Sequence, residues 1–89
     1  MKVFTPSKHT MRLMRRAFIL LTCGPGAEHE LTPKLEKLGG VVQVCQLWGI
    51  FDIMVEVGAE SEKELKDIVF SRIRTLEHVK STLTLNVVP

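Results

Sequence analysis

Hydrophobic positions divide the chain into alternating strand-like and helix-like segments. After residue 16 a short run, Ala-Phe-Ile-Leu-Leu-Thr, is apolar on both faces and ends at the glycines and proline of residues 24–26. A run of this kind, bounded by a turn signal, predicts a strand in the centre of a sheet that is covered on both sides.

A helix is expected after this turn. Its apolar positions recur at helical spacing with charged residues between them, namely Leu31, Leu35 and Leu38. The glycines at residues 39–40 supply the C-terminal stop, because glycine enters the left-handed conformation without a Cβ penalty. Pro33 lacks an N–H and its ring clashes with the preceding turn, so we expect either a kinked first turn or a helix that begins close to Thr32.

Two neighbouring strands follow as a hairpin. Residues 41–48 are rich in β-branched and apolar side chains, and residues 52–57 alternate between two kinds of position. In the second strand Ile53, Val55 and Val57 share one face, which we assign to the core. The short connection between the two strands is typical of an antiparallel pair.

The last third of the chain predicts a second helix and a last strand. Ser61 and Glu64 have the spacing of a capping box, in which the serine hydroxyl accepts from the glutamate N–H and the glutamate side chain reaches back. The apolar stripe behind this cap consists of Leu65, Ile68, Val69, Ile73 and Leu76. Residues 79–88 then alternate as a strand, with Leu83 and Leu85 on one face and threonines on the other.

The predicted order β-α-β-β-α-β is the split βαβ motif of an α+β fold. Right-handed crossovers place the first and third strands in the centre of a four-stranded antiparallel sheet, with both helices on one face. On the face without helices we expect the apolar side chains of the first strand beside Val88 and the threonines of the last strand. Because a second sheet usually closes such a face, we infer a face-to-face dimer with two-fold symmetry.

Length and composition narrow the class of protein. The chain has 89 residues, of which 45% are hydrophobic and 25% are charged, so it has the size and composition of a single globular domain rather than a disordered tail. Its longest apolar run is too short to span a membrane, and no cleavage pattern of a secretory signal follows that run. We therefore expect a cytoplasmic protein with no membrane partner.

The net charge of +2 is unevenly placed. Residues 1–16 contain five basic and no acidic residues, whereas the remaining seven basic and ten acidic residues sum to −3. We predict that residues 1–15 form a basic N-terminal arm. Such an arm could touch nucleic acid, membrane lipid or the acidic body of a neighbouring subunit.

The residues that usually catalyse reactions or bind metals are scattered. Cys23 and Cys45 have neither a Cys-x-x-Cys spacing nor a histidine at metal spacing, which favours two reduced cysteines over a zinc or catalytic site. His29 and His78 are far apart along the chain. The turn at residues 24–26 could cradle a phosphate, but it lacks the length and the lysine of a P-loop. We predict no catalytic residue, no metal and no cofactor.

The hairpin tip concentrates unusual residues in the segment Leu47-Trp48-Gly49-Ile50-Phe51-Asp52. The helix-covered core needs none of them. One interpretation is that the aromatic residues are packing anchors in a subunit interface. The other is a small-ligand site, with aromatic walls, an open backbone at Gly49 and Asp52 as the partner of a cation.

This tip resembles the effector-binding domain of the Lrp/AsnC transcription regulators, also called the RAM domain. The helix that ends in Val69-Phe70-Ser71-Arg72-Ile73 and the strand Val79-Lys80-Ser81-Thr82-Leu83-Thr84-Leu85 share the resemblance, which covers residues 16–89. It implies a ferredoxin-like sandwich that pairs through its sheets and assembles into octamers or similar rings. It also implies a free amino acid bound between neighbouring dimers.

Carried over by position, the resemblance implies a ligand site that consists of Trp48, Gly49, Ile50, Phe51, Asp52, Ser81, Thr82 and Thr84. The hairpin residues would form one wall, and the last strand would offer hydroxyls. A zwitterion is bound by main-chain N–H groups at its carboxylate and by a carboxylate such as Asp52 at its ammonium. Trp48 stands where the family often has a small or polar residue, so its indole could fill the pocket or bind an apolar side chain.

Full regulators of this family begin with a helix-turn-helix domain of about 50 residues, which residues 1–15 cannot hold. We therefore expect a stand-alone amino-acid-sensing domain that oligomerises and modulates full-length Lrp/AsnC-type regulators, without direct sequence-specific DNA binding. The alternatives are a small enzyme on the same scaffold and a purely structural oligomeriser.

Overall fold

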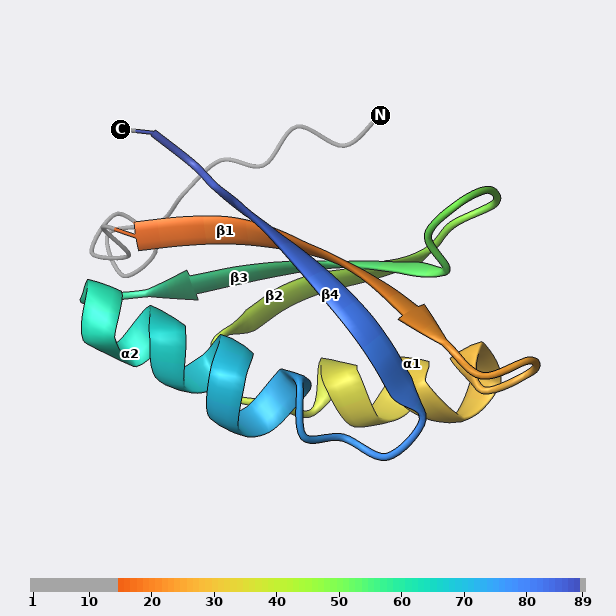
Figure 1. The fold of residues 1–89 in the computed structure, drawn as a ribbon. Helices are drawn as coiled ribbons and strands as arrows, with labels where there is room; N and C mark the ends of the chain where they lie inside the picture. The colour runs from red at the N-terminus through yellow and green to blue at the C-terminus, as the bar shows by residue number, and fades with distance from the viewer. Residues whose placement is uncertain (1–14, 89) are drawn as a thin grey trace.

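The computed structural model describes residues 15–88 and contains one four-stranded antiparallel sheet with both helices on one face (Figure 1). The elements are β1 (Arg15–Cys23), α1 (Glu28–Glu36), β2 (Val41–Gln46), β3 (Ile53–Ala59), α2 (Glu62–Asp67), the π-helical segment η2 (Ile68–Ile73) and β4 (Val79–Asn86). The strand order is β2-β3-β1-β4. The predicted α+β fold with the first and third strands in the centre is confirmed. Except for Arg15, the predicted basic arm lies outside the described residues.

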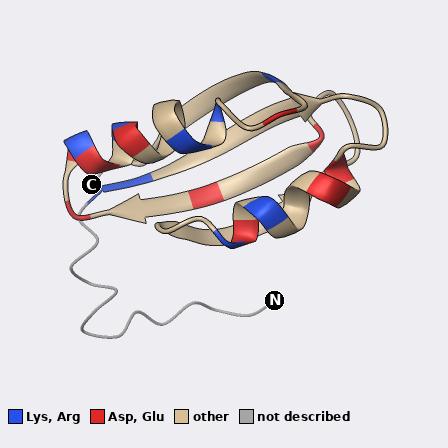
Figure 2. Ribbon diagram, turned by 90° about the horizontal axis from the view of Figure 1, so that it is seen from below, with Lys and Arg blue, Asp and Glu red and all other residues tan. Residues whose placement is uncertain are grey.

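The core lies between the sheet and the helices, because alternate residues of the central strands point to the same side. Ile19 of β1 stands directly opposite Val55 of β3, and both side chains are completely buried. The other fully buried large side chains are Leu21, Leu31, Leu35, Ile53, Val57, Ile68 and Ile73. The predicted core face of β3 is therefore confirmed. Charged residues gather on the helices, and the strands carry few of them (Figure 2).

Helix α1 begins earlier than its proline suggested. It starts at Glu28 and contains Pro33, so a start close to Thr32 is wrong. One helical hydrogen bond is lost at a proline, but burial of Leu31 and Leu35 against the sheet stabilises the helix across it.

Gly40 follows α1 with a φ of +89°, in the left-handed region that favours glycine. A Cβ at this position would collide with the Ile68 side chain. The close approach between the start of β2 and the second helix therefore requires a glycine here.

Helix α2 begins at the predicted cap. Ser61 Oγ accepts a hydrogen bond from the Glu64 N–H at 3.1 Å, and Glu64 Oε2 accepts one from the N–H of Glu60 at 3.4 Å. The helix then widens into η2, where the Arg74 N–H donates to the Val69 carbonyl at 3.0 Å. The apolar stripe had predicted the helix, but not this wider turn.

The helix-free face of the sheet is more apolar than expected. Phe18 stands opposite Leu85 and Leu20 opposite Leu83, and residues directly opposite in an antiparallel pair share a face. Leu83 and Leu85 are accordingly 46% and 48% exposed on the open face, while Thr84 points toward the helices. The expected placement of the threonines on the open face is wrong, because alternation alone does not say which set of side chains points inward.

Candidate functional site

The tip of the β2–β3 hairpin projects beyond the sheet (Figure 1). The Leu47 N–H donates to the Asp52 carbonyl at 2.8 Å, which closes the loop, and Gly49 at its tip has a φ of +146°. The side chains of Trp48 and Ile50 are 102% and 88% exposed. Within one protomer neither is a packing anchor, so both are available to a ligand or to another chain.

Asp52 ties the base of this hairpin to the end of β1. Its Oδ2 accepts a hydrogen bond from the Cys23 N–H at 2.9 Å, and its own N–H donates to the Leu21 carbonyl at 2.9 Å. A carboxylate that accepts one hydrogen bond keeps lone pairs for further donors. The half-buried Asp52 side chain therefore stabilises the fold and can still bind a cation beside it.

An open pocket of about 560 Å³ lies beside the tip. Its walls come from the first turn of α1, the end of β2 and the hairpin, and consist of Glu28, His29, Gln46, Leu47, Trp48, Gly49 and Asp52. Trp48, Gly49 and Asp52 are predicted site residues, and the structure brings them together here. No motif marks Glu28 or His29. The topology is the signal that could have found them, because β1 ends, α1 begins and β3 begins at the same end of the sheet.

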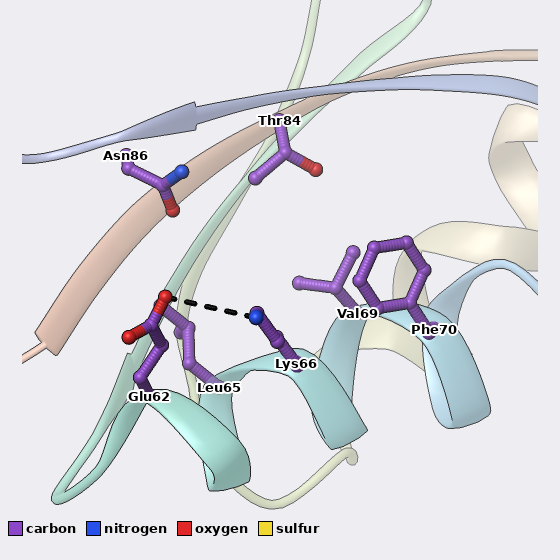
Figure 3. Close-up of a pocket in the computed structure, with 7 residues that line it drawn as sticks. All are labelled: Glu62, Leu65, Lys66, Val69, Phe70, Thr84 and Asn86. Atoms are coloured by element: carbon purple, nitrogen blue, oxygen red, sulfur yellow. Dashed lines mark ion pairs between the residues drawn. The ribbon is translucent and has the colours of Figure 1, made fainter.

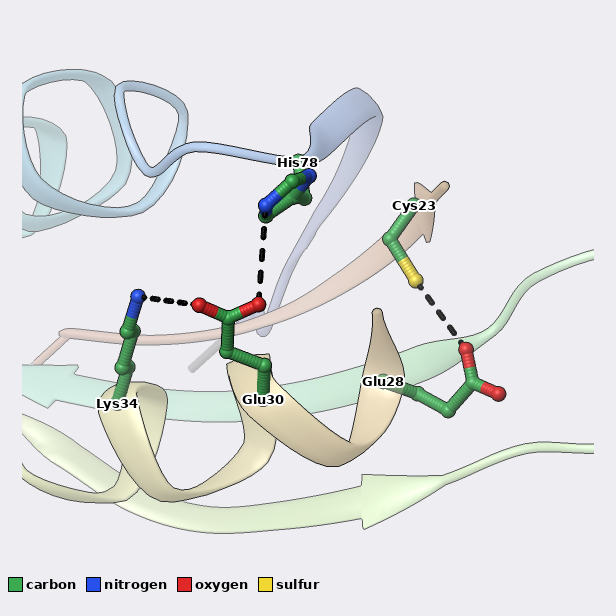
Figure 4. A network of polar contacts seen from close by, with 5 residues as sticks. All are labelled: Cys23, Glu28, Glu30, Lys34 and His78. Carbon is green, nitrogen blue, oxygen red and sulfur yellow. Dashed lines mark hydrogen bonds and ion pairs between the residues drawn. The ribbon is translucent and has the colours of Figure 1, made fainter. Parts of the chain in front are cut away.

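Cys23 contacts the carboxylates of both Asp52 and Glu28 at this end of the sheet. Its Sγ donates to Glu28 Oε2 at 3.7 Å (Figure 4). Burial, followed by the negative charges of Asp52 and Glu28, raises the pKa of the Cys23 thiol to about 11. Because the thiolate is the reactive form, this cysteine behaves as a small buried side chain and not as a nucleophile at neutral pH.

Five of the predicted site residues lie outside this pocket, namely Ile50, Phe51, Ser81, Thr82 and Thr84. Ser81 shares a hydrogen bond between hydroxyls with Thr22. Thr82 lies in β4, directly opposite Leu21 of β1. Asp52 contacts Leu21 from the other side of β1. Two strand spacings, about 10 Å, therefore separate Thr82 from Asp52.

Thr84 lines a different cavity, of about 140 Å³, between the second helix and β4 (Figure 3). The walls of this cavity consist of Glu62, Leu65, Lys66, Val69, Phe70, Thr84 and Asn86. Lys66 Nζ lies 3.7 Å from Glu62 Oε1, so the two charges on its rim compensate each other. Within one protomer, the predicted hairpin wall and the predicted hydroxyls belong to different surfaces.

Among residues 15–88, no group of three or more His, Cys, Asp or Glu is placed to hold a metal ion. Within the same range, no helix is both long enough and apolar enough to cross a membrane.

Comparison with protein families gives a match over nearly all of the described chain. A model of the Lrp/AsnC ligand binding domain matches residues 16–88. An uncharacterized HTH-type transcriptional regulator of Pyrococcus furiosus is 28% identical over 83 residues, which are 90% of this chain and 55% of that protein. The chain therefore spans about half the length of this relative.

A homocitrate synthase of Saccharolobus islandicus is 41% identical over 54 residues, which are 61% of this chain. They are also 12% of that enzyme, so the match concerns a short segment of it.

Solved structures share the fold. A protein of Thermus thermophilus has a TM-score of 0.80 and 29% identity, over 85% of this chain and 95% of its own. A transcriptional regulator of Neisseria meningitidis, solved as an L-Met complex, has a TM-score of 0.81 over 100% of this chain and 59% of its own. At 15% identity, the second likeness is one of fold alone.

Proposed function

Because the chain belongs to the Lrp/AsnC ligand-binding-domain family, we propose that it binds a free amino acid and regulates transcription through its assembly, with itself and with full-length Lrp/AsnC-type regulators. The observation that carries the proposal is the open pocket in which Trp48, Gly49 and Asp52 lie together. The L-Met complex of the Neisseria regulator, which has this fold, supports an amino acid as the ligand. The cytoplasm is the compartment that keeps the two free cysteines reduced.

The hairpin supplies the groups that a zwitterion needs. The Asp52 carboxylate pairs with the ammonium, and main-chain N–H groups beside Gly49 donate to the carboxylate in charge-assisted hydrogen bonds. The exposed indole of Trp48 covers the ligand side chain. Ile50 and Phe51 extend this wall.

A dimer forms through the open face of the sheet. The face carries Phe18, Leu20, Met54, Leu83 and Leu85, all at least partly exposed in a single protomer. Removing such a face from water stabilises association by about 25 cal/mol per Å² of apolar area. A second copy of the same face is its natural cover, because a two-fold axis pairs identical surfaces.

The ligand site is shared between neighbouring copies. The hydroxyls of Ser81, Thr82 and Thr84 lie apart from the pocket of their own protomer, so we assign them to the pocket of an adjacent copy in a ring of dimers. Ligand binding then depends on assembly. The ligand shifts that assembly by the difference between its affinities for the assembled and separated states.

Substitution of Asp52 by asparagine tests the site assignment. Asp52→Asn keeps a side-chain oxygen for the Cys23 N–H but removes the charge, so we expect amino acid affinity to fall about tenfold or more while the dimer persists. A thermal-shift screen of the standard amino acids finds the ligand, calorimetry measures its affinity, and light scattering reports assembly with and without it.

Asp67→Asn is the matched control, because Asp67 is an exposed carboxylate that pairs with Arg72 on the second helix, away from the pocket. Equal amino acid affinities of the Asp52→Asn variant and the unmodified chain would show that Asp52 is not part of the ligand site. A screen in which no amino acid stabilises the protein would instead favour a purely structural oligomeriser.

A further inference from the structure

The open pocket at the hairpin end carries two carboxylates from different elements. Glu28 reaches it from the first turn of α1 and Asp52 from the start of β3. Its other lining side chains include the imidazole of His29 and the amide of Gln46, but no lysine or arginine. The fixed charge on the walls of this pocket is therefore negative.

The two carboxylates converge on one residue. Asp52 Oδ2 accepts from the Cys23 main-chain N–H at 2.9 Å. Glu28 Oε2 accepts from the Cys23 thiol at 3.7 Å, the contact drawn in Figure 4. Both negative charges contribute to the raised pKa of this thiol, after its burial. The carboxylates are thus close enough for their fields to overlap at the edge of the pocket.

No basic side chain compensates these charges within residues 15–88. The ion pairs of this part of the chain join other residues, and neither Glu28 nor Asp52 belongs to one. Glu30 provides the contrast on the same helix, because it pairs with Lys34 at 3.1 Å and lies 3.7 Å from His78. A free amino acid brings one ammonium for Asp52, which leaves the Glu28 carboxylate without a cation.

We propose that this pocket selects an amino acid with a positively charged side chain, such as lysine or arginine, and that Glu28 determines the selection. The inference rests on the proposed function of the same site. Asp52 binds the α-ammonium, and Glu28 binds the side-chain cation in a charge-assisted hydrogen bond. The exposed indole of Trp48 covers the methylene groups between the two charges and adds a cation–π contact.

Pairs of ligands that differ in one charge test the selection. Calorimetry on the full chain compares L-lysine with L-norleucine and L-arginine with L-citrulline. We expect each basic ligand to bind at least about tenfold more tightly than its neutral counterpart, the gain typical of a hydrogen bond to a charged group. Glu28→Gln should remove most of this advantage, so that L-lysine and L-norleucine bind with similar affinities.

Glu30→Gln is the matched control, because it removes the same charge from the same helix at a side chain directed toward Lys34 and His78 (Figure 4). It should keep the preference for L-lysine. Circular dichroism confirms that each variant is folded.

Two results would overturn the inference and leave the proposed function intact. One is equal affinity for the basic and the neutral member of each pair. The other is a preference for L-lysine that survives Glu28→Gln as fully as it survives Glu30→Gln. If no amino acid binds at all, the proposed function fails, and the selection fails with it.

Discussion

The two faces of the sheet are built from the same strands but differ in what covers them. In β1, Ile19 and Leu21 are completely buried beneath the helices, whereas their neighbours Phe18 and Leu20 are half-buried on the open face. Successive side chains of a strand point to opposite sides, so one apolar strand serves two layers. One protomer therefore completes its inner apolar layer by itself, whereas its outer apolar layer stays partly exposed and is the surface that the proposed dimer would bury.

Truncation of a buried side chain should destabilise the protein more in the inner layer than in the outer layer when the protein is dilute. Ile19→Ala leaves a cavity in the inner layer and should lower the free energy of unfolding by about 2–5 kcal/mol at any protein concentration. Leu20→Ala, one residue along β1, should cost less when the protein is dilute and more when it is concentrated, because Leu20 lies on the face that the proposed dimer buries. Urea unfolding at several protein concentrations measures both. Equal, concentration-independent losses would contradict the comparison.

The next effect concerns assembly. The double variant Leu83→Asp and Leu85→Asp places two charges on the open face, so we expect a folded monomer by light scattering. The expected loss is about 1.5–3 kcal/mol of association free energy for each leucine that the dimer buries. Lys63→Asp, on the exposed surface of α2, is the control and should leave the dimer intact. A double variant that stays dimeric would show that another surface pairs.

The stability of the protein at high pH should depend on Cys23 and not on Cys45. Burial and nearby carboxylates raise the pKa of Cys23 from 9.0 to about 11, so the folded state holds this proton more tightly than the unfolded state does. The resulting stability is present below pH 9.0 and is lost as the pH rises toward about 11. Cys23→Ala should reduce the decrease in melting temperature between pH 9.0 and about 11. Cys45→Ala, at a position opposite Met54 on the open face, should leave that decrease unchanged.

Local patterns were sufficient to predict the elements of the fold. The apolar run of β1, the leucine spacing of α1, the cap at Ser61 and the alternation of β3 each depend on neighbours a few residues apart. The order of these elements then limits the topology to few choices, because crossovers are right-handed. The start of α1 was less predictable, since tertiary burial of its leucines outweighs the local effect of Pro33.

The orientation of β4 was not predictable in the same way. Its apolar and polar residues alternate, but a shift of one residue in register exchanges the two faces. The pairing with β1 sets the register, and that pairing shifts between Thr22 and Cys23, near the start of β4. The outward placement of Leu83 and Leu85 therefore follows from long-range pairing.

The candidate site also combines residues that local sequence predicted with residues that only tertiary packing brings in. Trp48, Gly49 and Asp52 were predicted together because they lie on one short loop, and a loop keeps its residues close in any fold. Glu28 and His29 lie some twenty positions earlier and join them because α1 begins at the end of the sheet where the hairpin closes.

Local sequence patterns predict which segments are strands and helices, which face of β3 is buried and where an aromatic tip interrupts the hairpin, because hydrophobic period and turn chemistry are local properties. Long-range packing sets which side of β4 faces outward and which acidic residues lie together beside the tip. It also places the predicted hydroxyls away from the pocket of their own protomer. These features depend on strand register and on packing between elements distant in sequence, which no local pattern contains.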